Sequence, residues 1–221
     1  MLVSDSLAKI DTYQSNYDRL LLNYETQLTK RNVMSFFPMY MDMENLKVLV
    51  VGGGYIATEK LEKLVDFTKE ITVIADKVSE EANTLIKEHC LTLYQRLYSR
   101  GDIEGFDIVI VATDTVDLHK AIYEESRGSR ILVNSVDNTD YCDFIFPSYV
   151  QKGDLTIAFS TGGASPAFAK QIRRHFEKII PDSVGEFLQK MKAMRSEIPK
   201  GKERMKYFDI LVEEYFKKYF K

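Results

Sequence analysis

"VLVVGGGYIATEK", residues 48–60, is a run of branched apolar residues that breaks into three glycines and continues with helical spacing. Gly52, Gly54 and Ala57 occupy the small positions of the pattern G-x-G-x-x-G/A. Glycines in such a turn permit positive φ and omit the Cβ atoms that would hold a phosphate away from the backbone. The amides of the first helical turn then point at the anion. The stretch therefore predicts a strand, a turn and a helix that bind a dinucleotide diphosphate, and a tight turn without a ligand is the alternative.

Short β-rich runs recur along the chain after this motif begins, and helical patterns separate several of them. Strands that alternate with helices favour parallel βαβ units, whose strands are apolar on both faces. The pattern predicts an α/β fold with a Rossmann-type parallel sheet. The predicted strands are residues 46–51, 70–75, 91–95, 107–112 and 130–135.

The pattern changes after residue 135. The segment "FIFPSYVQKGDLTIAFS" reads as two strands joined by a turn at residues 152–154, and Pro147 inside the first makes it an edge or bulged strand. Three helical stretches follow, the first ending at Pro181 and the others near 183–195 and 203–220. We expect a small α+β part and a helical C-terminal region behind the sheet. The predicted domains are 34–144 (NAD-binding), 145–181 (strands and basic helix) and 182–221 (helical).

Residues 1–33 form a predicted extension of a different character. Apolar and aromatic residues recur there at spacings of three and four from Leu7 to Leu28, as in a heptad seam. A helix packed on the body or on a partner is one interpretation. The other is that Met34 is the native start, which would make the extension an annotation artefact.

Composition excludes several functional classes. The formal net charge of −3 gives no electrostatic case for nucleic acid, and no apolar run approaches the roughly 20 residues that span a bilayer. Two cysteines and three scattered histidines predict neither a disulfide framework nor a metal site. We expect a soluble, cytoplasmic protein with no nucleic-acid or membrane partner.

Polar residues follow several predicted strands, at the edge where an open parallel sheet binds ligands. Asp76 is suited to the ribose hydroxyl of NAD, and its carboxylate would repel the 2′-phosphate of NADP, although Lys77 softens that discrimination. Helix capping or simple exposure is the alternative for Asp76, and capping for Thr113 and Asp114. The candidate cofactor-binding residues are Gly52, Gly53, Gly54, Tyr55, Ile56, Ala57, Asp76, Lys77, Thr113, Asp114 and Asn134.

Two further motifs point to a substrate. Asp137 follows the fifth strand, where an acid would take or orient a proton beside a nicotinamide; a turn cap shared with Asn138 is the alternative. In "STGGASPAFAKQIRRHF", two glycines precede a Ser165 N-cap and a helix with four basic residues. Such a helix suits a polycarboxylate, although its charges are also those of a solvated face.

These motifs resemble the precorrin-2 dehydrogenase family, which includes the N-terminal module of siroheme synthase. The similar segments are "FFPMYMDMENLKVLVVGGGYIATEKL", "DIVIVATD" and "VNSVDNTDYCDFIFPSYVQKGDLTIAFSTGGASPAFAKQIRRHFE". The resemblance runs from about Phe36 to Pro181, with a similar helical tail beyond.

The resemblance implies an enzyme that oxidises precorrin-2 to sirohydrochlorin with NAD, and in some members the same site also inserts Fe²⁺ to give siroheme. Asp137 matches the catalytic aspartate of the family. The implied substrate-binding residues are Ser160, Thr161, Gly162, Gly163, Ser165 and Arg173. Family members form homodimers through the segment that begins here near Phe144. The competing hypothesis is a non-catalytic Rossmann-type module that senses NAD, and an assembly subunit that uses the N-terminal heptads is a third.

Overall fold

The computed structural model describes residues 36–220 of the chain. The extension predicted for residues 1–33 lies outside the described residues. The fold described below is that of the unit Tyr40–Lys221.

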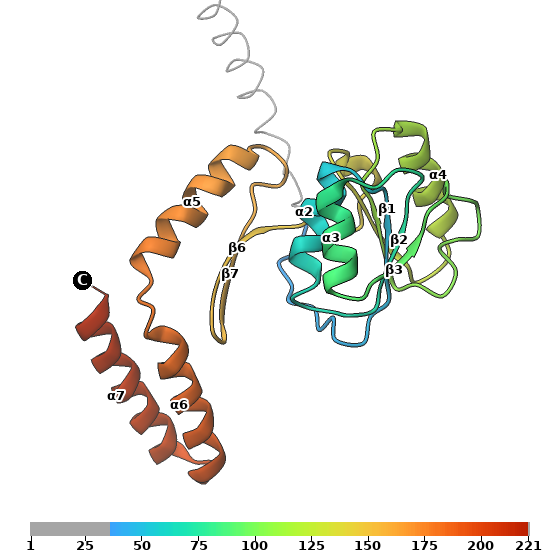
Figure 1. Cartoon of the computed structure of the whole chain (residues 1–221). Coiled ribbons are helices and arrows are strands. Elements are labelled where there is room, and N and C mark those ends of the chain that lie inside the picture. Colours follow the sequence, from blue (N-terminus) through green and yellow to red (C-terminus); the bar gives the residue numbers. More distant parts are fainter. Residues whose placement is uncertain (1–35, 221) are drawn as a thin grey trace, which may run out of the picture. The chain divides into compact units, whose positions relative to one another are not determined.

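Five parallel strands form the main sheet (Figure 1). They are β1 (Val48–Val51), β2 (Ile71–Ile74), β3 (Thr92–Tyr94), β4 (Ile108–Val111) and β5 (Leu132–Ser135), in the order β3-β2-β1-β4-β5. The predicted parallel sheet is therefore confirmed, although each strand is shorter than the run that predicted it. Val51 of β1 is paired with both Ile74 and Val111, so the carboxyl ends of the three central strands lie level at one edge.

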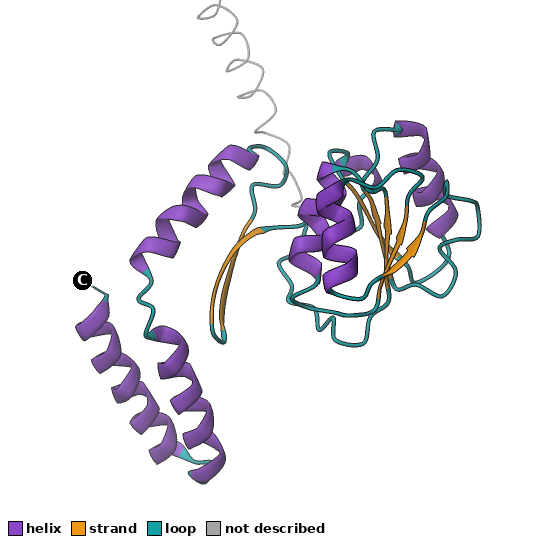
Figure 2. Ribbon diagram, in the orientation of Figure 1, coloured by secondary structure: helices purple, strands orange, loops and turns teal. Residues whose placement is uncertain are grey.

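Helices cover both faces of this sheet (Figure 2). The helices α2 (Tyr55–Leu64) and α3 (Glu80–Glu88) pack against Val48 and Val50, whereas Leu49 and Val51 point to the opposite face and pack with Ile122 of α4 (Val116–Ser126). All four residues of β1 are consequently buried, as expected for a parallel strand covered on both sides. The segment 95–107 joins β3 to β4 without a helix, and its buried Ile103 contributes to the α4 side.

A short 3₁₀ helix, η1 (Thr139–Tyr141), follows β5 and leads to an antiparallel hairpin of β6 (Ser148–Lys152) and β7 (Leu155–Phe159). The predicted hairpin is confirmed, but the prediction that Pro147 lies inside its first strand is wrong. The strand begins at Ser148, directly after the proline, whose ring nitrogen has no hydrogen to donate to a ladder. Three helices follow: α5 (Pro166–Ile179), α6 (Val184–Glu197) and α7 (Lys202–Tyr219).

The hairpin and these helices share a second, smaller core. Its buried residues are Val150, Ile180, Val184 and Tyr215. At the hairpin turn, a Cβ added to Gly153 would lie 2.8 Å from the Cα of Gly185, so the turn packs directly on the first turn of α6. In the described part of the chain, no helix is long and apolar enough to cross a membrane.

Candidate functional site

The glycine turn after β1 combines tight packing with an open side. A Cβ on Gly52, whose φ is +121°, would lie 2.2 Å from the carbonyl oxygen of Ala112, and one on Gly53 would lie 2.6 Å from that of Lys77. Neither position has room for a side chain. Gly54 differs, because a Cβ there would meet no atom within 4 Å. The third glycine therefore faces open space above the carboxyl edge of the sheet.

The first turn of α2 is left without a cap. Gly54 is its N-cap residue, no side chain in residues 36–220 caps it, and its first turn contains no acid. The neighbouring helix α3 contrasts with it: the Ser79 hydroxyl accepts from the amide of Ala82, and Glu80 and Glu81 lie in its first turn. The amides that open α2 thus remain available to a ligand, and the local field favours an anion. These residues fit the diphosphate of a dinucleotide.

The loops after β2 and β4 lie at the same edge. Asp76 and Lys77 follow β2 and are exposed, and the amide of Ser79 donates to the carbonyl of Gly53 at 2.8 Å, which fixes this loop beside the glycine turn. Thr113 and Asp114 follow β4. The structure thus brings these predicted cofactor residues to one edge, where their contact with a coenzyme stays a prediction.

A buried histidine supports the loop after β4. The Nε2 atom of His119 lies 2.8 Å from the carbonyl oxygen of Thr113, and the side chain is 4% exposed. Sequence reasoning assigned His119 no role. Its place one turn into α4, six residues beyond Thr113, is the only signal that points to this contact.

Asp137 presents its carboxylate to solvent from a constrained backbone. Its φ is +62°, in the left-handed region that aspartate tolerates better than most residues. The carboxylate makes no hydrogen bond or ion pair with the residues that the structure describes. The alternative of a turn cap falls instead to Asn138, whose Oδ1 accepts from the amide of Asp140 at 3.2 Å. Asp137 is thus left free for chemistry.

The thiol of Cys142 holds the two sides of the Asp137 loop together. Its sulfur accepts from the amide of Ser135 at 3.2 Å and lies 3.2 Å from the carbonyl oxygen of Asn138. Burial raises the pKa of the Cys142 thiol, so the thiol keeps a proton that it can donate to the carbonyl of Asn138 or to that of Ser135, which lies 3.1 Å away. Sequence reasoning treated Cys142 only as one of two cysteines and missed this role.

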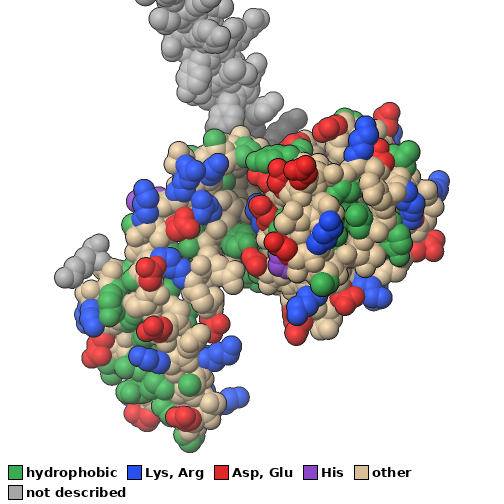
Figure 3. Space-filling view, in the orientation of Figure 1, with side chains coloured by type: hydrophobic (Ala, Val, Ile, Leu, Met, Phe, Trp, Pro, Cys, Tyr) green, Lys and Arg blue, Asp and Glu red, His purple; other side chains and the backbone are tan. Residues whose placement is uncertain are grey.

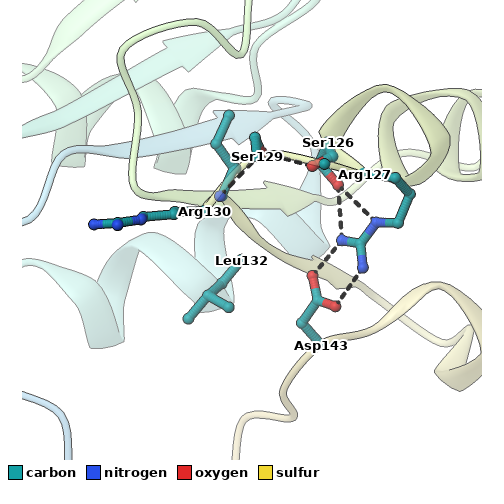
Figure 4. A pocket seen from close by; sticks show the side chains of 8 residues that line it. Ser126, Arg127, Ser129, Arg130, Leu132 and Asp143 are labelled. Atoms are coloured by element: carbon teal, nitrogen blue, oxygen red, sulfur yellow. Dashed lines mark hydrogen bonds and ion pairs between the residues drawn. The ribbon is translucent and has the colours of Figure 1, made fainter.

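An ion pair between Arg127 and Asp143 holds the chain directly after the Asp137 loop (Figure 4). Both guanidinium nitrogens of Arg127 donate to the Asp143 carboxylate, at 2.8 and 2.6 Å, and the amide of Val133 donates to it at 2.9 Å. Burial alone would raise the pKa of Asp143, but these hydrogen bonds and the Arg127 charge outweigh it and hold that pKa below its usual range.

The depression lined by residues 126–132 and Asp143 lies beside this ion pair. It is formed by the end of α4 and the beginning of β5, so it belongs to the amino edge of the parallel sheet. The glycine turn lies at the opposite, carboxyl edge. The depression is therefore separate from the coenzyme-binding loops.

Asn134 has a structural contact that its sequence position did not reveal. The side chain is 4% exposed and its Nδ2 donates to the carbonyl of Phe144 at 2.8 Å, so it fixes the chain beyond the Asp137 loop. Its Oδ1 atom is buried with no partner among the described residues. A direct contact between Asn134 and a coenzyme stays a prediction.

The loop at residues 160–165 lies next to Asp137, as its motif requires. A Cβ added to Gly163 would lie 3.4 Å from the Cγ2 atom of Thr139, which follows Asp137 by two residues. The Ser165 hydroxyl caps α5 by accepting from Phe168, which confirms the predicted N-cap. The amide of Gly162 donates to the Ser160 hydroxyl, so this amide is already bonded within the loop.

Two predicted substrate residues differ in their surroundings. The hydroxyl of Thr161 accepts from the amide of Ser165 at 3.1 Å and so belongs to this loop. Arg173 lies two turns into α5, where its guanidinium donates to Glu177 at 2.7 Å. The Arg173 charge is thus paired with a carboxylate of its own helix, and its contact with a substrate stays a prediction. No group of three or more metal-ligating side chains occurs within residues 36–220.

A parallel sheet with an uncapped glycine turn at its switch point defines the class of NAD(P)-binding Rossmann proteins. Comparison with known proteins agrees. Residues 39–148 match a family model described as putative NAD(P)-binding, and residues 152–179 match one described as sirohaem biosynthesis protein central. The predicted coenzyme class is thereby confirmed.

Individual relatives point to one group within the NAD(P)-binding Rossmann proteins. The siroheme synthase of Pseudoalteromonas atlantica is 37% identical over 162 residues, which cover 72% of this chain and 35% of the relative. That of Methylococcus capsulatus is 34% identical over 185 residues, 81% of this chain and 39% of the relative. The structure of SirC, a precorrin-2 dehydrogenase, superposes with a TM-score of 0.66 at 26% identity, over 80% of this chain and 88% of that one.

The chain belongs to the family of siroheme synthases and precorrin-2 dehydrogenases, which confirms the resemblance found in the sequence. It spans little more than a third of the length of the siroheme synthases that it matches.

Replacing Gly54 by Asp is expected to block coenzyme binding without disturbing the fold. The position has free space and extended backbone, and aspartate is a good N-cap residue, but its carboxylate would occupy and repel the diphosphate site. Calorimetric titration should show at least a tenfold loss of NAD affinity, about 1.4 kcal/mol, with an unchanged melting temperature. Gly54→Ala tests size without charge. Unaltered NAD affinity in Gly54→Asp would contradict the assignment of this turn.

Replacing Asp143 by Asn is expected to cost about 1–3 kcal/mol of folding stability at neutral pH, because the buried amide of Val133 and the partly exposed guanidinium of Arg127 lose a charged acceptor. The folded protein lowers the pKa of Asp143, so the carboxylate stabilises the fold fully at pH values above its unfolded pKa, near 3.9. This contribution to the free energy of unfolding is lost as the pH falls through the lower pKa of the folded state.

Urea denaturation from pH 7 downward measures this effect. The difference in unfolding free energy between wild type and Asp143→Asn should narrow below about pH 4. Asp140→Asn, a matched change at an exposed carboxylate nearby, should leave stability unaltered at every pH. A deficit in Asp143→Asn that is constant across the range would argue against the ion pair as its source.

Proposed function

We propose that this protein is an NAD-dependent dehydrogenase that oxidises precorrin-2 to sirohydrochlorin in siroheme biosynthesis. The observation that carries the proposal is the carboxylate of Asp137, which has no partner among residues 36–220 and is held on a fastened loop at the same sheet edge as the start of α2, which no side chain of those residues caps. Membership of the family and the likeness to SirC support it.

The chemistry removes two electrons and two hydrogens from the macrocycle. Bound at the carboxyl edge, NAD supplies the acceptor for a hydride. Asp137 accepts the proton that leaves with it, and since the carboxylate is exposed, it can pass that proton to solvent. The loop contacts of Cys142 and Asn138 keep the acid in place while the substrate is bound.

The remaining residues bind and orient the coenzyme and the substrate. The turn from Gly52 to Ala57, with Tyr55 and Ile56 at the helix start, holds the diphosphate. Asp76 and Lys77 meet the adenosine side, where the carboxylate favours NAD over NADP. Thr113, Asp114 and Asn134 lie toward the nicotinamide. The loop from Ser160 to Ser165 receives substrate carboxylates beside Asp137.

A non-catalytic NAD sensor would share the glycine turn with this enzyme. It would not need an acid held on a loop that the Arg127–Asp143 pair, the Asn134 amide and the Cys142 thiol fasten. The proposal is restricted to the oxidation step, because no feature of the described residues bears on Fe²⁺ insertion. A cytoplasmic location is part of the proposal, and the two free cysteines suit a reducing compartment.

We also propose that the protein acts as a homodimer through the segment that follows the sheet. Large apolar side chains are exposed on its helices, and Figure 3 shows hydrophobic side chains gathered there. Exposed patches of this kind mark association surfaces. The exposed residues are Phe168 and Ile179 on α5, and Met205, Tyr207, Ile210, Val212, Phe216 and Tyr219 on α7.

Replacing Asp137 by Asn should lower kcat for precorrin-2 oxidation at least about 100-fold, because the amide cannot accept the proton. Asparagine keeps the size of the side chain and tolerates the left-handed backbone, so NAD affinity and melting temperature should not change. The measurement is NADH formation together with the absorption of the tetrapyrrole.

Asp140→Asn, three residues along the same loop, is the matched control and should retain wild-type kcat. Retained activity in Asp137→Asn would remove this residue from the mechanism. Absence of NADH formation by the wild-type protein, with NAD bound, would favour the sensor instead.

Replacing Ile210 by Glu should convert the dimer to a monomer, because the charge would be buried in the apolar contact. Light scattering after gel filtration measures the mass, and circular dichroism checks the helices. Leu97→Glu, at an exposed leucine of the Rossmann part, should stay dimeric. A monomeric wild-type protein, or dissociation by Leu97→Glu as well, would refute this interface.

A further inference from the structure

Lys60 places a cation between the coenzyme-binding turn at the start of α2 and the loop that carries Asp137. It lies on α2, one helical turn beyond Ile56 and therefore on the same face of the helix. Its side chain is half-buried, and its Nζ atom lies 4.5 Å from the centroid of the Phe146 ring, on the chain that returns from the Asp137 loop. Ile56, Phe144 and Phe146 pack on the same apolar cluster.

The charges around Lys60 do not neutralise it. Burial lowers the pKa of Lys60, and Lys63 of the same helix acts in the same direction; Glu59 of α2 and Asp137 of the facing loop oppose them. Lys60 forms no ion pair or hydrogen bond with any residue between 36 and 220. The face of the Phe146 ring offsets only part of the cost of removing the ammonium from water.

The Lys60 ammonium would gain an ion pair if a ligand placed an anionic group beside it. The diphosphate already has the uncapped amides at the opening of α2. Lys60 lies about one helical turn further along the axis, and its ammonium lies over the Phe146 ring, on the chain that returns from the Asp137 loop. A carboxylate of the second ligand is therefore the anion that fits this position.

We propose that the ammonium of Lys60 binds a carboxylate of the tetrapyrrole and so orients the macrocycle against Asp137. This inference rests on the proposed function, since it takes the substrate to be a polycarboxylate tetrapyrrole. It assigns to the coenzyme-binding helix a second task, which is to hold the substrate.

Binding titrations test the assignment without requiring turnover. Metal-free sirohydrochlorin and NAD are titrated separately into wild type, Lys60→Met and Lys60→Arg. Lys60→Met keeps the length and apolar stem but removes the charge, so its Kd for sirohydrochlorin should rise about tenfold while its Kd for NAD is unchanged. Lys60→Arg should restore most of the affinity. Lys69→Met, an exposed lysine in the turn after α2, is the matched control and should bind like wild type.

Two further measurements separate binding from a structural role. With precorrin-2 as substrate, Lys60→Met should raise KM much more than it lowers kcat. Its melting temperature without ligands should equal or exceed that of wild type, because an uncompensated half-buried charge has been removed. A Lys60 that merely stabilised the fold would give a lower melting temperature.

The outcomes are distinct. Wild-type protein that binds sirohydrochlorin, with Lys60→Met binding it equally well, overturns the role of Lys60 and leaves the proposed function standing. Weakened NAD binding in Lys60→Met assigns the lysine to the coenzyme and overturns the proposal. Wild-type protein that neither binds sirohydrochlorin nor oxidises precorrin-2 contradicts the proposed function itself.

Discussion

The backbone of Gly52 passes so close to Ala112 that a Cβ would lie 2.2 Å from its carbonyl oxygen. This approach occurs where β1 and β4, paired along their whole length, reach the edge of the sheet. It sends the chain directly into α2, so the opening amides of that helix stand over the carboxyl ends of the strands. The loops that carry Asp76, Thr113 and Asp137 meet at the edge that this turn defines.

The two halves of the site are built differently. The coenzyme side consists of backbone groups, namely the glycine turn and the amides at the start of α2. The main chain itself positions these groups, without the help of side chains. The acid side consists of a loop whose geometry depends on side chains, namely the Cys142 thiol, the Asn134 amide and the Arg127–Asp143 ion pair. Substitutions should therefore affect the two halves unequally, because main-chain groups persist when side chains change.

Much of the sheet was predictable because its interactions are local or periodic. A central strand buried on both faces favours apolar residues throughout, and Val48–Val51 reads that way in the sequence. The Ser165 cap and the Gly54 turn were equally visible, since each depends on residues a few positions apart. The Arg173–Glu177 pair, at a spacing of four, was available to the same reasoning but was overlooked.

The contacts that fasten the acid loop were not predictable in this way. Arg127 and Asp143 are 16 positions apart on different elements, and only the folded chain brings them together. The isolation of Lys60 is likewise invisible in sequence, because Glu59 and Lys63 beside it suggest an ordinary solvated face.

The strand order also has a consequence for how the sheet assembles. The central strand β1 pairs with β4, and the adjoining bond from the Lys47 amide to the Asp107 carboxylate spans 60 positions. The chain between Lys47 and Asp107 must lose conformational entropy before β1 and β4 can form their hydrogen bonds. A nascent chain emerging from the ribosome can therefore pair β1 with β2 early, but the middle of the sheet waits until β4, which ends at Val111, has been translated.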